Sequence, residues 1–208
     1  MPETARLAVD IGGTFTDVAL DLGGVMFTRK VLTTTQAPEE GVMAGVRAVL
    51  PEAGISAKDL DFIVHGTTLA TNTVIERKGA KTALVVTEGF RDAVEMGYEH
   101  RFDQYDINID KPVPLVPRRL RREITERIAA DGSMIEPLDE DELIRVGGEL
   151  VAQGVQSIAI CFINSFRNSD HERRAEEILR RHFPEVSVTA SVSVLAEMRE
   201  YERTSTAV

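Results

Sequence analysis

The stretch VDIGGTFTDVAL, residues 9–20, limits what this chain can fold into more than any other part of its sequence. An apolar, β-rich run ends on Asp10, two glycines follow, and a second β-rich run begins almost at once. Glycine has no Cβ, so Gly12 and Gly13 can take positive φ in a tight turn and let several backbone N–H groups converge on an anion. The stretch therefore indicates either a polar hairpin turn or a loop that holds phosphate.

The polar residues around this turn favour the phosphate loop. Thr14 and Thr16 add hydroxyl donors, and a simple turn does not require so many polar groups. Asp10 would repel phosphate directly, so we expect it to hold Mg²⁺, which neutralises phosphate oxygens. Asp17 could assist the metal or position a nucleophile. The patterns G-x-x-x-x-G-K-[ST] and G-x-G-x-x-G are both missing from the sequence, which argues against P-loop and Rossmann proteins.

The first half of the chain predicts a mixed sheet. Glycine pairs separate three short β-rich runs, which is typical of an antiparallel meander. The predicted elements are the meander over residues 6–32, a helix from Pro38 to about Pro51, a strand over 61–66, a helix that stops at Gly79 and a strand over 80–87. Because helices and strands alternate after the meander, the sheet should become partly parallel.

The second half predicts a hairpin followed by a β-α-β unit. The expected elements are an irregular stretch over 97–117, a hairpin turn at Asp131-Gly132-Ser133, a helix with a capping box at Asp139 and Glu142, a buried strand over 155–163, a helix with a capping box at Ser169 and Glu172, a strand over 185–190, and helical spacing from Leu195 onward. We therefore divide the chain into a first subdomain (1–96), an irregular excursion (97–120) and a hairpin plus βαβ portion (121–208).

A second polar constellation, HGTTLATN, occupies residues 65–72 at the predicted junction of a strand and a helix. Backbone N–H groups, hydroxyls and an amide near a helix N-terminus can bind a carboxylate, a carbonyl or a phosphoryl group. The residues that we select are His65, Thr67, Thr68, Thr71 and Asn72. Simple helix capping by Thr67 and Thr68 is the alternative interpretation.

A third group of charged residues surrounds the irregular stretch. Arg101 is the best candidate there for pairing with an anionic substrate group, because guanidinium binds carboxylate through two hydrogen bonds. Glu95 is a further candidate substrate-binding residue. The alternative is that this loop is charged only because it is solvated.

The composition excludes several classes of protein. The 208 residues carry a formal net charge of −10 with no basic tail, which argues against nucleic-acid and anionic-membrane partners. A single cysteine, Cys161, excludes an intrachain disulfide and fits a reducing compartment. No apolar stretch approaches the ~20 residues of a membrane span, and the first strand begins too early to leave room for a signal peptide. We therefore predict a cytoplasmic protein.

The motifs resemble the N-terminal region of the hydantoinase A / 5-oxoprolinase family, which includes the β-type subunits of ATP-dependent acetone carboxylases. The resemblance is carried by DIGGTFTDVAL, by HGTTLATNTVIERKGAKTALVVTEGFRDAVEMG and by EMREYERTSTAV, and it covers essentially the whole chain. The first motif is shared with the wider actin, Hsp70 and sugar-kinase superfamily. That superfamily implies a ribonuclease-H-like α/β fold, in which a mixed sheet begins with an antiparallel meander and continues through βαβ crossovers.

The resemblance also implies ATP and Mg²⁺ as cofactors. It maps the first phosphate-binding turn onto Asp10, Gly12, Gly13, Thr14, Thr16 and Asp17, and it places His65, Thr67, Thr68, Thr71 and Asn72 near the acceptor or the γ-phosphate. In the family, ATP phosphorylates the oxygen of an amide, a lactam or another carbonyl-type acceptor, and water then attacks the activated carbon and opens the ring. The implied substrate is a cyclic amide such as 5-oxoproline or a hydantoin.

Family members are considerably longer and two-lobed, and a second phosphate loop and the adenosine pocket come from the later lobe. No second Gly-Gly-Thr follows in this sequence. We therefore expect a missing C-terminal lobe, a hydantoinase B-type partner subunit, and weak ATP binding with little turnover by this chain alone. Two alternatives stay open: a carboxylase subunit of the acetone carboxylase type, and a truncated, inactive assembly domain.

Overall fold

The computed structural model describes residues 4–34, 36–98, 105, 108, 110 and 112–208. The chain divides into two compact units, Met1–Lys78 and Gly79–Val208, each described here by itself. The sequence predicted that the first subdomain would extend to residue 96. The structure divides the chain after Lys78, because the strand that follows packs within the second unit.

The first unit is built on a four-stranded mixed sheet. Strands β1 (Ala5–Ile11), β2 (Phe15–Leu22) and β3 (Val25–Leu32) form the predicted antiparallel meander. Strand β4 (Phe62–Thr67) then pairs with β1 in parallel, which gives the strand order β3-β2-β1-β4. The predicted change from antiparallel to parallel pairing is confirmed.

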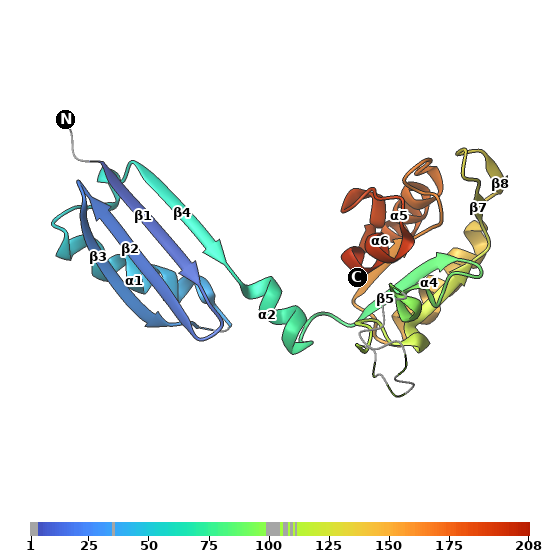
Figure 1. Ribbon diagram of the computed structural model, residues 1–208, viewed down its shortest axis with the longest axis horizontal. Coiled ribbons are helices and arrows are strands. Elements are labelled where there is room, and N and C mark those ends of the chain that lie inside the picture. The colour runs from blue at the N-terminus through green and yellow to red at the C-terminus, as the bar shows by residue number, and fades with distance from the viewer. Residues whose placement is uncertain (1–3, 35, 99–104, 106–107, 109, 111) are drawn as a thin grey trace. The chain divides into compact units, whose positions relative to one another are not determined.

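Helix α1 (Pro38–Glu52) covers one face of this sheet (Figure 1). Alternate residues of β1 are buried and exposed, as expected for a strand with one covered face. A Cβ on Gly45 of α1 would lie 2.6 Å from Cγ2 of Val18, so the helix approaches the sheet closely only because this residue is glycine. The buried apolar residues are Leu7, Val9, Ile11, Val18, Leu20, Val49 and Leu50.

The other face of the sheet is exposed within the first unit. It carries residues such as Asp10 of β1, Asp17 of β2 and Lys30 of β3, all of which are exposed. A short 3₁₀ helix (Ala57–Asp59) precedes β4, and helix α2 (Leu69–Glu76) follows it. Among the described residues, no helix is long and apolar enough to cross a membrane.

The second unit contains a separate, fully parallel sheet. Its strands are β5 (Thr82–Thr87), β6 (Arg121–Ile124), β9 (Ser157–Cys161) and β10 (Ser187–Ala190), in the order β10-β9-β5-β6. The parallel pairing of β9 and β10 across helix α5 (Asp170–His182) confirms the predicted β-α-β unit. Strand β5 pairs with β6 and β9 and does not continue the first sheet.

The remaining elements of this unit surround the sheet. They are α3 (Ala93–Met96), the 3₁₀ helix Arg118–Leu120, the hairpin strands β7 (Arg127–Ile128) and β8 (Met134–Glu136), α4 (Glu140–Ala152), the 3₁₀ helix Ser191–Ser193 and α6 (Glu200–Ala207). The predicted hairpin turn is present, and Gly132 in it has φ +90°. Its positive φ explains the glycine at this position.

Neither predicted capping box is complete, because Glu142, which should bond back to Asp139, accepts from the Thr125 N–H at 2.9 Å. At α4 the Asp139 carboxylate accepts a hydrogen bond from the backbone N–H of Glu142 at 2.8 Å, as expected for an N-cap. At α5 the Ser169 side chain makes no capping bond. Glu172 is fully buried instead, and it accepts from the Phe162 N–H at 2.7 Å and the Ser191 hydroxyl at 2.7 Å. Burial raises the pKa of Glu172, against the effect of these hydrogen bonds.

The fully buried Arg203 ties α6 to the end of the parallel sheet. Its guanidinium donates to the Ser191 hydroxyl at 3.1 Å, to the Phe162 carbonyl at 2.7 Å and to the Glu197 carbonyl at 2.6 Å. Since the Ser191 hydroxyl also donates to Glu172, the buried cation and the carboxylate are linked through one serine. This network holds α6 in the second unit.

Candidate active site

The candidate site lies in the first unit, where β1 turns into β2. The Gly12 N–H donates to the Phe15 carbonyl at 2.9 Å and closes the turn. A Cβ on Gly12 would lie 2.9 Å from that carbonyl oxygen, and a Cβ on Gly13 would lie 2.9 Å from Nδ2 of Asn72. Neither glycine has positive φ, contrary to the reason given from the sequence. Close approach of neighbouring atoms is what requires glycine at both positions.

Thr33, which lies outside the motif, holds the turn through two hydrogen bonds. The Thr33 hydroxyl donates to the Gly12 carbonyl at 2.9 Å, and the Thr33 N–H donates to the Thr14 carbonyl at 3.0 Å. Thr16 is fully buried, and its hydroxyl lies 3.0 Å from the Thr33 hydroxyl. Thr16 therefore has a supporting position beneath the loop, in place of the direct phosphate contact that the sequence suggested. Thr14 is exposed.

Four residues form a row across the exposed face of the sheet. The strand register pairs Gly66 with Asp10, Asp10 with Asp17, and Asp17 with Lys30. The Lys30 ammonium lies 3.0 and 3.2 Å from the two oxygens of Asp17. A hollow of about 400 Å³ lies over this row, and Ala8, Ala19 and Val64 also line it.

Asp10 fits the role of a magnesium ligand. Its side chain is exposed, and no hydrogen bond or ion pair joins it to another described residue. Gly66 stands next to Asp10 on the neighbouring strand and has no side chain. A Cβ at this position would contact Oδ1 of Asp10 at 3.7 Å, so the glycine leaves that side of the carboxylate uncovered. Mg²⁺ is usually bound through one or two carboxylates together with phosphate oxygens and water. Within the described ranges, no group of three acidic, histidine or cysteine side chains could form a metal site from protein ligands alone.

The second motif packs directly against the turn. The Thr68 N–H donates to the Ile11 carbonyl at 3.2 Å, and the Asn72 amide donates to the Thr68 hydroxyl at 3.3 Å. The Thr67 hydroxyl accepts from the Leu69 N–H at 3.2 Å, whereas Thr68, at the N-cap of α2, makes no capping bond. Asn72 and Gly13 are therefore neighbours, so the structure brings the two motifs into contact. Thr71 is exposed on α2.

His65 lies on the other face of the sheet from the carboxylates. It pairs in register with Val9, which is buried beneath α1, whereas Gly66 pairs with Asp10. Because successive residues of a strand point to opposite faces, His65 and Asp10 point away from each other. The fold brings His65 to the strand end but not to the Asp10–Asp17 row.

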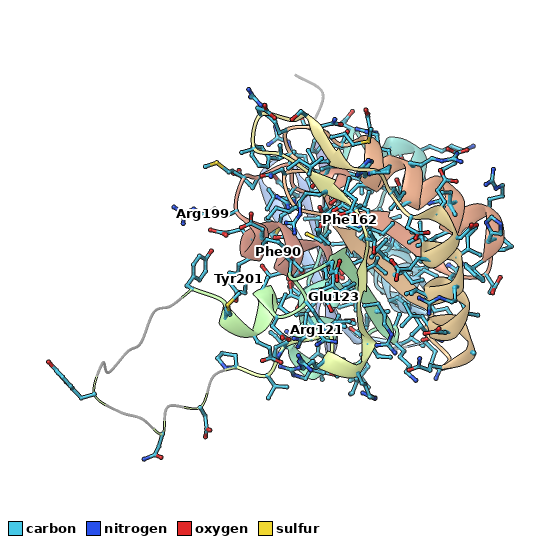
Figure 2. All side chains as sticks on the ribbon, turned by 90° about the vertical axis from the view of Figure 1, so that its right-hand side faces the viewer. Phe90, Arg121, Glu123, Phe162, Arg199 and Tyr201 are labelled. Carbon is cyan, nitrogen blue, oxygen red and sulfur yellow. The ribbon has the colours of Figure 1, made fainter. Side chains whose placement is uncertain are left out.

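The two remaining candidates belong to the part of the chain after the first unit. Glu95 belongs to α3 of the second unit, where it accepts from the buried Arg121 guanidinium at 2.9 Å. Figure 2 labels Arg121 in this unit. Arg121 also donates to the Val116 carbonyl at 2.9 Å, so Glu95 neutralises a buried structural cation. Arg101 lies outside the described residues.

Sequence reasoning missed Lys30 and Thr33. The signal for Lys30 was present, because a meander with a known turn fixes which residues stand opposite one another. Counting from the Gly23-Gly24 turn pairs Asp17 with Lys30. The Thr33 contacts could not be found by counting alone, since Thr33 lies one residue beyond β3.

This arrangement is typical of α/β proteins that bind phosphate: a close-packed glycine turn and an open carboxylate lie at one end of a sheet, next to the start of a helix. The family model for the hydantoinase/oxoprolinase N-terminal region matches residues 6–183. The chain belongs to this family.

Known relatives match almost the whole chain. It is 38% identical to the caprolactamase subunit alpha of Pseudomonas jessenii and 35% identical to the acetophenone carboxylase gamma subunit of Aromatoleum aromaticum, over 98% and 96% of its length. The nucleotide-free structure of acetone carboxylase matches 99% of the chain at 29% identity, with a TM-score of 0.88. The crystal structure of the ATP-dependent caprolactamase matches 97% at 37% identity, with a TM-score of 0.84. The ribonuclease-H-like α/β fold is consistent with these neighbours.

The chain spans about 30% of the length of these relatives. Several of them are subunits by name.

Proposed function

We propose that this chain provides the first phosphate-binding turn of an ATP-dependent hydrolase that opens a cyclic amide. The observation that carries the proposal is the contact of Gly13 with Asn72, which joins the glycine turn to the HGTT motif beside the open carboxylate of Asp10. The likeness to a caprolactamase supports a lactam as the substrate class. The three substrates to test are 5-oxoproline, hydantoin and caprolactam.

In this proposal the chain binds and orients the phosphates of ATP. The backbone of Gly12 and Gly13 lets an anion approach closely, because no Cβ stands in the way. Asp10 would hold Mg²⁺, which supplies positive charge to the phosphate oxygens. The lactam oxygen would take the terminal phosphoryl group as ADP leaves. One water would then add to the activated carbon, and the ring C–N bond would break as the nitrogen takes a proton, which leaves an acyl phosphate. A second water would hydrolyse this acyl phosphate to the carboxylic acid and free phosphate.

Carboxylation is the second candidate function. It is favoured by the likeness to the acetophenone carboxylase subunit and by the acetone carboxylase structure. In that case the phosphorylated acceptor would pass to a partner subunit for reaction with bicarbonate. The first unit would perform the same task in both reactions, since phosphate binding does not depend on the acceptor.

The complete site requires more chain than the residues described here. We propose that a later lobe and a hydantoinase B-type partner complete it, because the longer relatives include named subunits. ATP held at one turn on an exposed sheet face would stay in contact with water, so this chain alone should bind it weakly. A cytoplasmic location is part of the proposal.

The test measures ATP hydrolysis by the intact protein, with its partner subunit, against each acceptor. Ring opening of 5-oxoproline, hydantoin or caprolactam that depends on ATP and not on bicarbonate would support the hydrolase. ADP formation that requires acetone or acetophenone together with bicarbonate would support the carboxylase. Failure with both acceptor classes, together with no Mg²⁺-ATP binding, would leave only the inactive assembly domain.

An Asp10→Asn variant tests the assigned position. Its amide keeps the size of the side chain but removes the charge that holds Mg²⁺. We expect ATP binding by this variant to lose its dependence on Mg²⁺. Asp21→Asn is the same kind of change on β2, away from the glycine turn, and it should leave that dependence in place. Equal Mg²⁺ dependence in Asp10→Asn and the unchanged protein would contradict the assignment.

A further inference from the structure

The row across the exposed face carries an unusual distribution of charge. Asp10 and Asp17 stand directly opposite each other on β1 and β2, and like charges in such a pair repel. Lys30, opposite Asp17 on β3, supplies a positive charge to this row. Without Lys30, an anion that entered the hollow above the row would meet the two carboxylates of the row without the ammonium that neutralises one of them.

Lys30 also lies close to the glycine turn. Its ammonium lies 5.2 Å from the centre of the Phe15 ring, and Phe15 is the first residue of β2 after the turn. Lys30, Asp17 and Phe15 share the exposed face, because alternate residues of a strand point the same way. The ammonium is therefore on the same side of the sheet as Asp10.

The Lys30–Asp17 ion pair is exposed, so the lysine can exchange its partner readily. Both side chains are more than half exposed, at 57% and 54%, and exposed ion pairs contribute little stability. Phosphate oxygens accept charge-assisted hydrogen bonds from lysine as carboxylate oxygens do, so a bound phosphate can replace Asp17 as the partner of this flexible side chain. Lys30 can thus neutralise Asp17 when the hollow is empty and neutralise a phosphate when one is bound.

We propose that Lys30 contacts a phosphate oxygen of ATP directly. The inference rests on the proposed function, because it takes ATP as the ligand of the turn, and it adds a residue that neither motif contains. Asp17 then holds the ammonium in place in the absence of nucleotide, and Asp10 is left for the metal. This makes Lys30 a binding residue of the site and Asp17 its positioning residue.

Arg29 provides a matched control on the same strand. It is adjacent to Lys30, has the same charge and is similarly exposed, but it pairs with Glu52 of α1 at 2.5 Å on the covered face. Replacing either residue changes the net charge of the protein by the same amount. Arg29 also lines the hollow, but its guanidinium pairs with Glu52, whereas the Lys30 ammonium pairs with Asp17.

The experiment is a calorimetric titration of the intact protein with ATP in the presence of Mg²⁺. We expect Lys30→Met to weaken ATP binding about 10- to 100-fold, as for the loss of one hydrogen bond to a charged group. Lys30→Arg and Arg29→Met should stay within about threefold of the unchanged protein, because each keeps a cation on the exposed face. Circular dichroism confirms that each variant is folded.

A second background separates direct contact from simple neutralisation of Asp17. If Lys30 only neutralised Asp17, Lys30→Met would have no effect once Asp17→Asn had removed that charge. Direct contact predicts the same loss in both backgrounds. A loss that disappears with Asp17→Asn, an equal loss in Arg29→Met, or unchanged binding by Lys30→Met would each overturn the inference while the proposed function stands. No ATP binding by the unchanged protein would overturn both.

Discussion

The contact between Gly13 and Asn72 can be tested by a double-mutant cycle on stability. Gly13→Ala places a Cβ 2.9 Å from Nδ2 of Asn72, about an ångström inside ordinary van der Waals contact. The amide must then rotate away from the Thr68 hydroxyl, to which it donates at 3.3 Å. Because the backbone of Gly13 does not require positive φ, the whole cost of the substitution should come from this clash.

The magnitude follows from the two things that the amide loses. A lost hydrogen bond costs about 0.5–1.5 kcal/mol, and an off-rotamer side chain costs about 0.5–1.5 kcal/mol. Replacement of glycine by alanine returns about 0.4–1 kcal/mol through the unfolded state. We therefore expect Gly13→Ala to destabilise the first unit by about 1–2 kcal/mol. In an Asn72→Ala background the clashing amide is gone, so the same change should stabilise the first unit by the remaining gain of about 0.4–1 kcal/mol.

Urea unfolding followed by two probes measures these changes. The sequence has no tryptophan, and Tyr98, Tyr105 and Tyr201 all lie in the second unit. Tyrosine fluorescence therefore reports the second unit, whereas far-ultraviolet circular dichroism reports both. The Gly13→Ala change should shift only the circular dichroism transition.

Two glycines provide the controls for this cycle. Gly12→Ala clashes with the backbone carbonyl of Phe15, so Asn72→Ala should not rescue it. Gly66→Ala places its Cβ in ordinary contact with Asp10 at 3.7 Å, so it should be tolerated. An equal cost of Gly13→Ala with and without Asn72 would refute the reasoning.

Three further predictions concern single side chains. Thr33→Val should destabilise the first unit by about 1–3 kcal/mol in the circular dichroism transition, because it leaves the buried Thr16 hydroxyl without its partner; an unchanged midpoint would contradict this. Arg203→Met should lower the tyrosine-detected free energy of unfolding by about 2–4 kcal/mol, since it removes two buried hydrogen bonds and a partly buried one, and a loss below about 0.5 kcal/mol would refute the network. Arg118 holds the pKa of Asp92 below 3.8, so this pair stabilises the fold above that pH and less as the pH falls below it; Arg118→Met should raise the Asp92 pKa toward 3.8 in a carbon-13 titration, and no rise would count against the pair.

Much of the local structure was predictable because neighbouring residues encode it. Glycine pairs located the turns, and the alternation of apolar residues identified strands that have one covered face. The two site motifs were assigned to the correct strand end and helix start. The resemblance to the hydantoinase/oxoprolinase family was confirmed by the match over residues 6–183.

Other features depended on contacts between distant segments. The sequence at Ser169 and Glu172 has the spacing of a capping box, but the carboxylate is used by Phe162 and Ser191 from other elements. Glu95 was selected as a substrate-binding residue, but its carboxylate accepts a hydrogen bond from the buried Arg121 guanidinium. In both cases the carboxylate pairs with buried groups from other elements and does not follow the local pattern. The reason is that an unpaired polar group in the interior costs more free energy than a missing cap at the surface.

The sequence by itself determined the turn, the strands around it and the polar residues gathered beside it, since these follow from backbone geometry and residue type over a few positions. Only the tertiary structure decided that Asn72 meets Gly13, that Lys30 stands beside Asp17 while His65 faces away, and that β5 leaves the first sheet. Pairing between distant strands is set by which apolar faces cover each other, and no local pattern records that choice.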